Sequence, residues 1–203
     1  MARFIPISRS RPWESRFKME PIDLLKEIVG ERTVFAGIGN ALRGDDGFGP
    51  YFINKLKERK LVPEDYLLTV EDVPENFAFP ISRIEADNVV FVDAVIVEEA
   101  PAGSVIFGPL EAFEEIGEIA STHRLSLKLT ARIIKETGKK VFILGVVPET
   151  TEFGRGMTPP VIRSADELVE VFGDLISEKD KSLENNPDET RSSKSRARKK
   201  EKT

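Results

Sequence analysis

Short apolar runs alternate with amphipathic segments along most of this chain, and this alternation constrains the fold more than any other feature. The apolar runs have the length of strands, whereas the amphipathic segments have helical spacing. The predicted strands cover residues 33–38, 67–70, 89–92, 103–107 and 141–147, and the predicted helices cover 21–28, 50–59, 77–84, 125–135 and a segment opened by Ser164 as N-cap. Strands that alternate with helices favour a parallel sheet covered on both faces. We therefore predict an α/β fold, a three-layer sandwich around a mainly parallel, roughly five-stranded twisted sheet with helices on both faces.

The two ends of the chain differ in composition from its body. Residues 1–20 contain basic and polar positions where a secretory signal would need an apolar run. The stretch from 177 onward is charged and has almost no apolar residue after Leu183. We therefore expect an N-terminal extension over 1–20, one domain over 21–176 and a disordered tail over 177–203.

Composition excludes several classes of protein. There is no cysteine, so disulfides, thiolate metal sites and cysteine nucleophiles are excluded. No apolar run approaches the roughly 20 residues of a membrane-spanning helix, and the net charge of −5 gives no electrostatic footprint for nucleic acid. We expect a monomeric cytoplasmic protein without membrane insertion. The absence of glutamine and the 32% of charged residues favour a thermophilic source.

Four side chains that could carry chemistry come from three separate segments. Asp45 and Asp46 follow the first predicted strand, Asp93 ends the third, and His123 precedes a predicted helix. In open α/β sheets, ligands bind beyond the carboxyl ends of the strands, so these side chains should meet there. Two carboxylates and an imidazole suit a divalent first-row metal, and three protein ligands leave coordination positions open.

Each of these residues also has an ordinary structural interpretation. An aspartate after a glycine-rich turn often caps the next helix, and this interpretation is favoured for one of Asp45 and Asp46. A lone histidine is more often structural than a ligand. The glycine-rich segment could instead bind a phosphate, but the third glycine of a dinucleotide fingerprint is replaced by Leu42, and adjacent carboxylates would repel a pyrophosphate.

The run from Gly37 to Pro50, Gly-Ile-Gly-Asn-Ala-Leu-Arg-Gly-Asp-Asp-Gly-Phe-Gly-Pro, resembles the signature of the NiFe hydrogenase maturation endopeptidases. Val92-Asp93-Ala94 is similar to the family's second acidic position, and Ser121-Thr122-His123 is similar to its histidine segment. Residues 73–76 and 144–149 resemble the branch that serves hydrogenase 3 of formate hydrogenlyase. The resemblance covers about residues 33–172.

This resemblance implies a function and a set of site residues. The activity would be hydrolysis of the NiFe hydrogenase large-subunit precursor, which loses its C-terminal extension after nickel insertion. Asp46, Asp93 and His123 would bind the nickel that the precursor carries, and Asp46 replaces the glutamate of other branches. The catalytic candidates are these three residues and Asp45. No organic cofactor is implied.

The mechanism and two other functions stay open at this point. The sequence has no H-E-x-x-H, no G-x-S-x-G and no cysteine, so the common protease mechanisms lack support. In one hypothesis the metal assists cleavage, with Asp45, Asp46 or Asp93 as general base and N–H groups of residues 39–47 as oxyanion donors. In the other, nickel is only recognised. The alternative functions are a nucleotide- or cofactor-binding module and a non-catalytic nickel chaperone.

Overall fold

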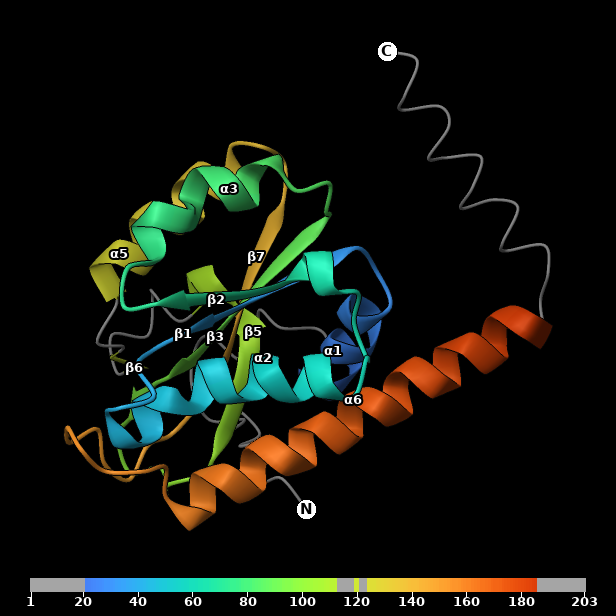
Figure 1. Cartoon of the computed structure of the whole chain (residues 1–203). Coiled ribbons are helices and arrows are strands. Elements are labelled where there is room, and N and C mark those ends of the chain that lie inside the picture. Colours follow the sequence, from blue (N-terminus) through green and yellow to red (C-terminus); the bar gives the residue numbers. More distant parts are fainter. Residues whose placement is uncertain (1–20, 113–118, 121–123, 186–203) are drawn as a thin grey trace.

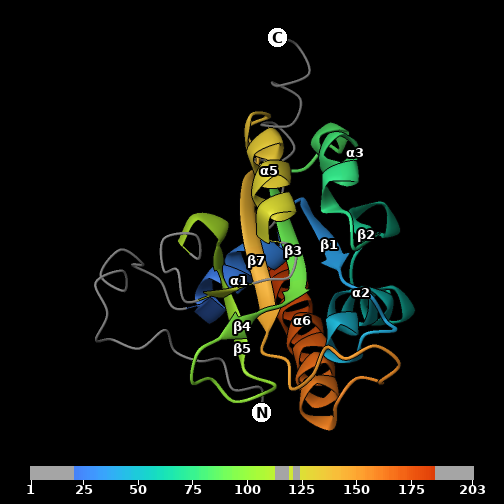
Figure 2. The same cartoon turned by 90° about the vertical axis from the view of Figure 1, so that its left-hand side faces the viewer.

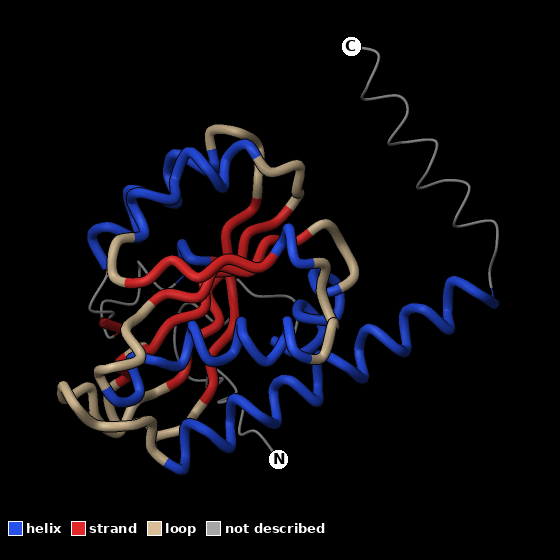
Figure 3. Tube along the Cα trace, viewed as in Figure 1, coloured by secondary structure: helices blue, strands red, loops and turns tan. Residues whose placement is uncertain are grey.

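The fold is built on a five-stranded sheet (Figures 1 and 3). The computed structural model describes residues 21–112, 119–120 and 124–185. The strands are β1 (Thr33–Ile38), β2 (Leu67–Glu71), β3 (Asn88–Ala94), β5 (Val105–Pro109) and β7 (Lys140–Val146). Their order is β2-β1-β3-β7-β5, and all neighbours are parallel except β5, which lies antiparallel to β7 at the edge. The predicted fold class is confirmed.

Helices cover both faces of this sheet (Figure 1). The helices of the first face are α1 (Pro21–Val29), α2 (Phe48–Glu58) and α6 (Pro159–Asn185), and those of the second are α3 (Ala78–Arg83) and α5 (Arg124–Lys135). In β3, Val90 and Val92 face the first set of helices, whereas Val89 and Phe91 face the second. Because both faces of the central strands are buried, their sequences are continuously apolar.

Aromatic packing joins the sheet to α2 and α6. Phe172 of α6 makes edge-to-face contacts with Phe35 of β1 at 5.4 Å and with Phe52 of α2 at 5.2 Å between ring centroids. All three rings are fully buried. Burial of each such side chain stabilises the fold by roughly 1.5–3 kcal/mol, so this cluster holds α2 in place over the sheet.

Several short elements escaped the sequence analysis. They are the 3-10 helices η2 (Gly44–Gly47), η3 (Glu64–Tyr66) and η4 (Pro74–Phe77), and a separate antiparallel pair formed by β4 (Ile96–Val97) and β6 (Ile119–Ala120). None of these elements is long enough to produce a recognisable hydrophobic period. Three of them, η2, η4 and β4, each follow a parallel strand of the main sheet and therefore lie near its carboxyl edge.

The predicted start of the last helix at Ser164 is wrong. The helix begins at Pro159, because proline is well tolerated in the first helical turn, where its missing N–H has no partner to lose. Ser164 lies inside the helix and is buried. Its hydroxyl donates to the Gly103 carbonyl at 2.6 Å, so this serine ties α6 to the segment before β5.

The predicted domain boundary at 176 falls inside α6, which continues to Asn185. Extending a formed helix is far less costly than nucleating one, and this segment is rich in glutamate and lysine, which have good helix propensity. Lys179 also donates to the Gly30 carbonyl. Residues 1–20 and 186–203 lie outside the described ranges, so the N-terminal extension and the disordered tail stay predictions. Neither α6 nor any other described helix is long and apolar enough to cross a membrane.

Candidate functional site

The strand order reverses between β1 and β3, and this reversal locates the site. The chain leaves β1 for β2 on one side and then crosses to β3 on the other side of β1. Loops that leave neighbouring strands in opposite directions open a crevice at the carboxyl edge of the sheet. The glycine-rich loop follows β1, and Asp93 is the penultimate residue of β3. Figure 2 shows the loop that leads into α2 beside the loop that follows β7.

Two glycines allow the loop to pack tightly against the ends of both strands. A Cβ atom at Gly49 would lie 2.2 Å from the Ile38 carbonyl oxygen and 2.4 Å from that of Val92. A Cβ atom at Gly39 would lie 1.9 Å from the Asp46 carbonyl oxygen, and Gly39 has a φ of +119°, which other residues avoid. The glycines therefore bring the segment that carries Asp46 onto the ends of β1 and β3.

Asp46 is buried in η2 and held by the loop that precedes it. Its Oδ2 accepts a hydrogen bond from the Asn40 N–H at 2.8 Å. The Asn40 side chain in turn accepts from the Leu42 N–H at 2.9 Å and donates to Asp72 at 3.0 Å. The loop after β1 is thereby tied to the segment after β2. Asp46 has a defined orientation because the residue that holds it is itself held on two sides.

Asp93 is fully buried and comes from the next strand. It pairs in register with Gly145 of β7, and η2 packs against β3. The fold thus places the segments that carry Asp46 and Asp93 in contact at the switch point. Buried carboxylates are costly in the ionised form unless polar partners or a cation compensate. This donor set suits a hard or borderline divalent cation.

Asp45, the neighbouring carboxylate, has a different environment. Its Oδ1 accepts from the Thr158 N–H at 2.6 Å, and its Oδ2 accepts from the N–H groups of Glu149 and Thr150 at 2.8 and 3.2 Å and from the Thr158 hydroxyl at 3.0 Å. Four donors on a buried carboxylate leave little capacity for a further hydrogen bond from a substrate. Asp45 joins η2 to the loop after β7, which favours a structural function for it.

The third predicted nickel ligand is His123. His123 lies outside the described residues, and within those residues no group of three histidine, aspartate or glutamate side chains is arranged to hold a metal ion. Its flanking elements, β6 and α5, are described, and β6 pairs with β4 directly after β3. The ligand role of His123 therefore stays a prediction.

Most backbone N–H groups of the glycine-rich loop already donate hydrogen bonds within the protein. Among residues 39–47, the N–H groups that donate within the protein belong to Gly39, Asn40, Leu42, Arg43, Gly44, Asp45 and Asp46. A phosphate cradle needs several free N–H groups that point at one anion. The loop does not provide them, which argues against nucleotide binding and also against the hypothesis that this loop supplies a row of oxyanion donors.

The sequence analysis missed the loop after β7 as part of the site. This loop donates to Asp45 through Thr158, Glu149 and Thr150, and its carbonyls at Thr150 and Arg155 accept from the N–H groups of η2. Thr158 stands more than a hundred residues from Asp45, in no recognisable motif. The only available signal was the position of the loop after a predicted parallel strand, which places it at the same edge.

A family model and a solved structure indicate the same family for this chain. Residues 50–174 match the family model described as hydrogenase maturation protease. The structure aligns with the crystal structure of the NiFe hydrogenase maturation protease HycI from Thermococcus kodakarensis KOD1 with a TM-score of 0.64 and 32% sequence identity. The alignment covers 76% of this chain and 99% of that chain.

Two relatives from Escherichia coli strain K12 bear on the predicted branch. The chain is 27% identical to the hydrogenase 2 maturation protease, over 64% of this chain and 81% of that protein. It is also 27% identical to the hydrogenase 3 maturation protease, over 61% of this chain and 78% of that protein. The comparisons confirm the predicted family and do not resolve the hydrogenase 3 branch. The chain belongs to the hydrogenase maturation protease family and is a peptide hydrolase.

Proposed function

We propose that this chain removes the C-terminal extension of a NiFe hydrogenase large-subunit precursor after nickel has been inserted. The observation that carries the proposal is the pair of buried carboxylates, Asp46 and Asp93, at the switch point of a sheet shared with hydrogenase maturation proteases. Buried acids with this placement are suited to a cation that arrives with the substrate, because the cation compensates for their desolvation.

Nickel belongs to the substrate in this proposal. Asp46, Asp93 and His123 bind the ion that the precursor holds, so a precursor without nickel lacks the contacts that bring its cleavage point to the site. Cleavage is thereby restricted to precursors that have received their metal. The Asn40 N–H keeps the Asp46 carboxylate in place for this contact, and the rigid β3 backbone does the same for Asp93.

The direct experiment follows the mass of the precursor. The full chain is incubated with nickel-loaded and with nickel-free large-subunit precursor, and intact masses are measured over time. We expect loss of a C-terminal peptide from the loaded precursor alone. Equal cleavage of both precursors would contradict the nickel requirement, and no cleavage of either would contradict the protease proposal.

Substitutions at the carboxylates test which residues carry the activity. Asp46→Asn and Asp93→Asn keep the side-chain size but remove the charge, and we expect cleavage to fall by about 10²–10⁴-fold. Asp87→Asn makes the same chemical change at the opposite edge of the sheet and is the matched control, with little change expected. A pure recognition role would raise KM and preserve kcat, whereas a role in bond cleavage would lower kcat. Normal kinetics for both site variants would exclude these carboxylates.

A further inference from the structure

Large apolar side chains are exposed at one edge of the molecule. Leu42 follows β1, Val73 follows β2, Ile96 follows β3 and Phe153 follows β7, and their exposed fractions are 61%, 40%, 54% and 72%. Each of the four parallel strands is thus followed within a few residues by an exposed apolar side chain. The remaining exposed large apolar residues in the described ranges lie on α3 and α5, the two helices that start from this edge.

The loops that carry three of these side chains are joined to one another. The Gly154 N–H donates to the Leu42 carbonyl at 2.7 Å, which places Phe153 beside the loop after β1. The Gly39 N–H donates to the Glu71 carbonyl at 3.1 Å, and Asn40 bonds Asp72 next to Val73. These three apolar side chains, Leu42, Val73 and Phe153, therefore stand on one connected set of loops. We call residues 39–43, 71–77, 95–99 and 148–158 the carboxyl-edge surface.

The exposed charges of this surface are mostly negative. The acidic side chains are Glu71, Asp72, Glu75, Glu98, Glu99, Glu149 and Glu152, and the basic ones are Arg43 and Arg155. Arg155 is paired with Glu152 at 2.6 Å, which reduces the positive charge further. An acidic surface with apolar side chains is complementary to a partner that carries basic and apolar groups.

We propose that the carboxyl-edge surface docks a polypeptide segment of the precursor that carries lysine or arginine side chains among apolar ones. The inference rests on the proposed function and adds the chemistry by which the substrate is recognised. Contiguous exposed apolar side chains next to a buried site are typical of protein-binding surfaces. The acidic side chains supply specificity and accelerate association with a basic partner.

Other occupants fit this surface less well. Nucleic acid and anionic lipid carry negative charge and would be repelled. A second copy of the chain, related by a two-fold axis, would bring identical acidic surfaces face to face. A basic, apolar segment of a protein substrate satisfies both the charge and the exposed apolar side chains.

Steady-state cleavage of the nickel-loaded precursor tests the apolar part of the proposal. Phe153→Ser removes the most exposed aromatic side chain of the surface without touching the carboxylates. We expect KM to rise about tenfold with kcat nearly unchanged, the size of effect found for one good interface contact. An unchanged KM for both Phe153→Ser and Leu42→Ser would overturn the docking role of the apolar side chains.

Charge reversal at the two edges of the sheet tests the role of the acidic side chains in the proposed docking. Glu75→Lys with Glu98→Lys reverses two exposed charges of the surface, and Glu64→Lys with Asp65→Lys makes the same change beside the opposite edge as the matched control. We expect the first double variant to raise KM about tenfold at low salt, with a smaller effect in 1 M NaCl, and the control to change KM less than twofold. Equal effects of the two double variants would overturn the charge complementarity.

A measurement of precursor binding, made beside the cleavage assay, distinguishes failure of this inference from failure of the proposed function. If the wild-type chain binds the precursor but does not cleave it, the proposed function fails, and the docking inference is judged by the Kd of the same variants. If the wild-type chain cleaves and every surface variant cleaves with unchanged KM, the function stands and the docking inference is overturned.

Discussion

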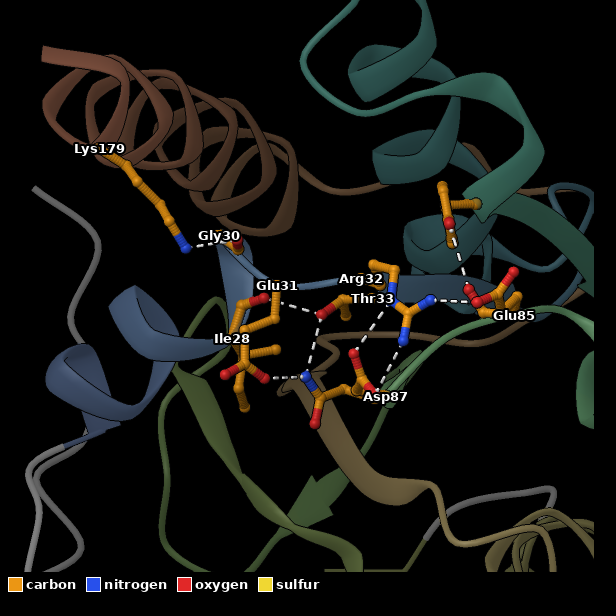
Figure 4. A network of polar contacts seen from close by, with 10 residues as sticks. Ile28, Gly30, Glu31, Arg32, Thr33, Glu85, Asp87 and Lys179 are labelled. Carbon is orange, nitrogen blue, oxygen red and sulfur yellow. Dashed lines mark hydrogen bonds and ion pairs between the residues drawn. The ribbon is translucent and has the colours of Figure 1, made fainter. Parts of the chain in front are cut away.

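The two edges of the same sheet use polar residues in opposite ways. At the amino edge, charged side chains pair with each other: Arg32 bonds Asp87 at 3.2 Å and Glu85 at 2.5 Å, and the hydrogen bond to Asp87, followed by that to Glu85, raises the pKa of the guanidinium (Figure 4). At the carboxyl edge, Asp45 and Asp46 accept from backbone N–H groups of loops.

The edges also differ in what they expose. At the described amino edge Arg32 pairs with Glu85 and Asp87, and the Asn88 amide is bonded to Glu31 at 2.7 Å. The carboxyl edge buries the carboxylates of Asp45, Asp46 and Asp93 and exposes apolar side chains instead. Buried acids and exposed apolar groups both reduce stability relative to the reverse arrangement. We infer that the carboxyl edge is shaped by binding and the amino edge by stability.

The largest expected difference in stability between the edges comes from substitution of two glycines with positive φ, one at each edge. Gly39→Ala would place a Cβ atom 1.9 Å from the Asp46 carbonyl oxygen, whereas Gly138→Ala, beside the amino edge, would meet no atom within 4 Å. Both changes incur backbone strain of about 1 kcal/mol. We expect Gly39→Ala to lower the free energy of unfolding by about 3–5 kcal/mol in total, because the η2 segment must move as well.

Urea unfolding of the two variants measures this difference, and cleavage of the precursor measures its consequence. Gly39→Ala should lose activity because Asp46 is displaced, and Gly138→Ala should retain it. Equal destabilisation by the two substitutions would show that the close contact at Gly39 relaxes without effect on the site.

The second-largest loss of stability is expected from removal of the four hydrogen bonds that Asp45 accepts. Asp45→Asn replaces one acceptor oxygen with an NH₂ group that faces a donor, and we expect a loss of about 2–3 kcal/mol in the free energy of unfolding. Thr158→Val removes one donor and should cost about 1 kcal/mol. Because the two residues share one network, the double variant should lose less than the sum of the single losses.

Thr158→Ser keeps the hydroxyl and is the control for this cycle. If Asp45 acts by joining η2 to the loop after β7, kcat should fall in both Asp45→Asn and Thr158→Val and stay near normal in Thr158→Ser. A kcat that falls in Asp45→Asn alone would support the general-base role that the sequence analysis left open. Additive stability losses would contradict the coupling between the two residues.

The sequence predicted the edge and the carboxylates but not how they are held. The glycine-rich run and the strand-end position of Asp93 are local features, so motif and topology rules located them. The contacts of Asp45 with Thr158 depend on tertiary packing between distant segments, and no local pattern marks them. Ser164 shows the same limit, because a serine followed by Glu167 matches a capping box although the helix begins earlier at Pro159.

The smallest effect is expected at the amino edge. Arg32→Gln removes a guanidinium that is 42% exposed, so solvent screens its ion pairs with Asp87 and Glu85. We expect a loss of about 0.5–1 kcal/mol in the free energy of unfolding at low salt and a smaller loss in 1 M NaCl. Arg32→Lys is the control, since it keeps the charge but not the planar pairing geometry. Cleavage of the precursor should be unchanged in both variants. If Arg32→Gln instead slowed cleavage as strongly as a carboxyl-edge substitution, the amino edge would take part in binding, and the division of the sheet into a stability edge and a binding edge would be wrong.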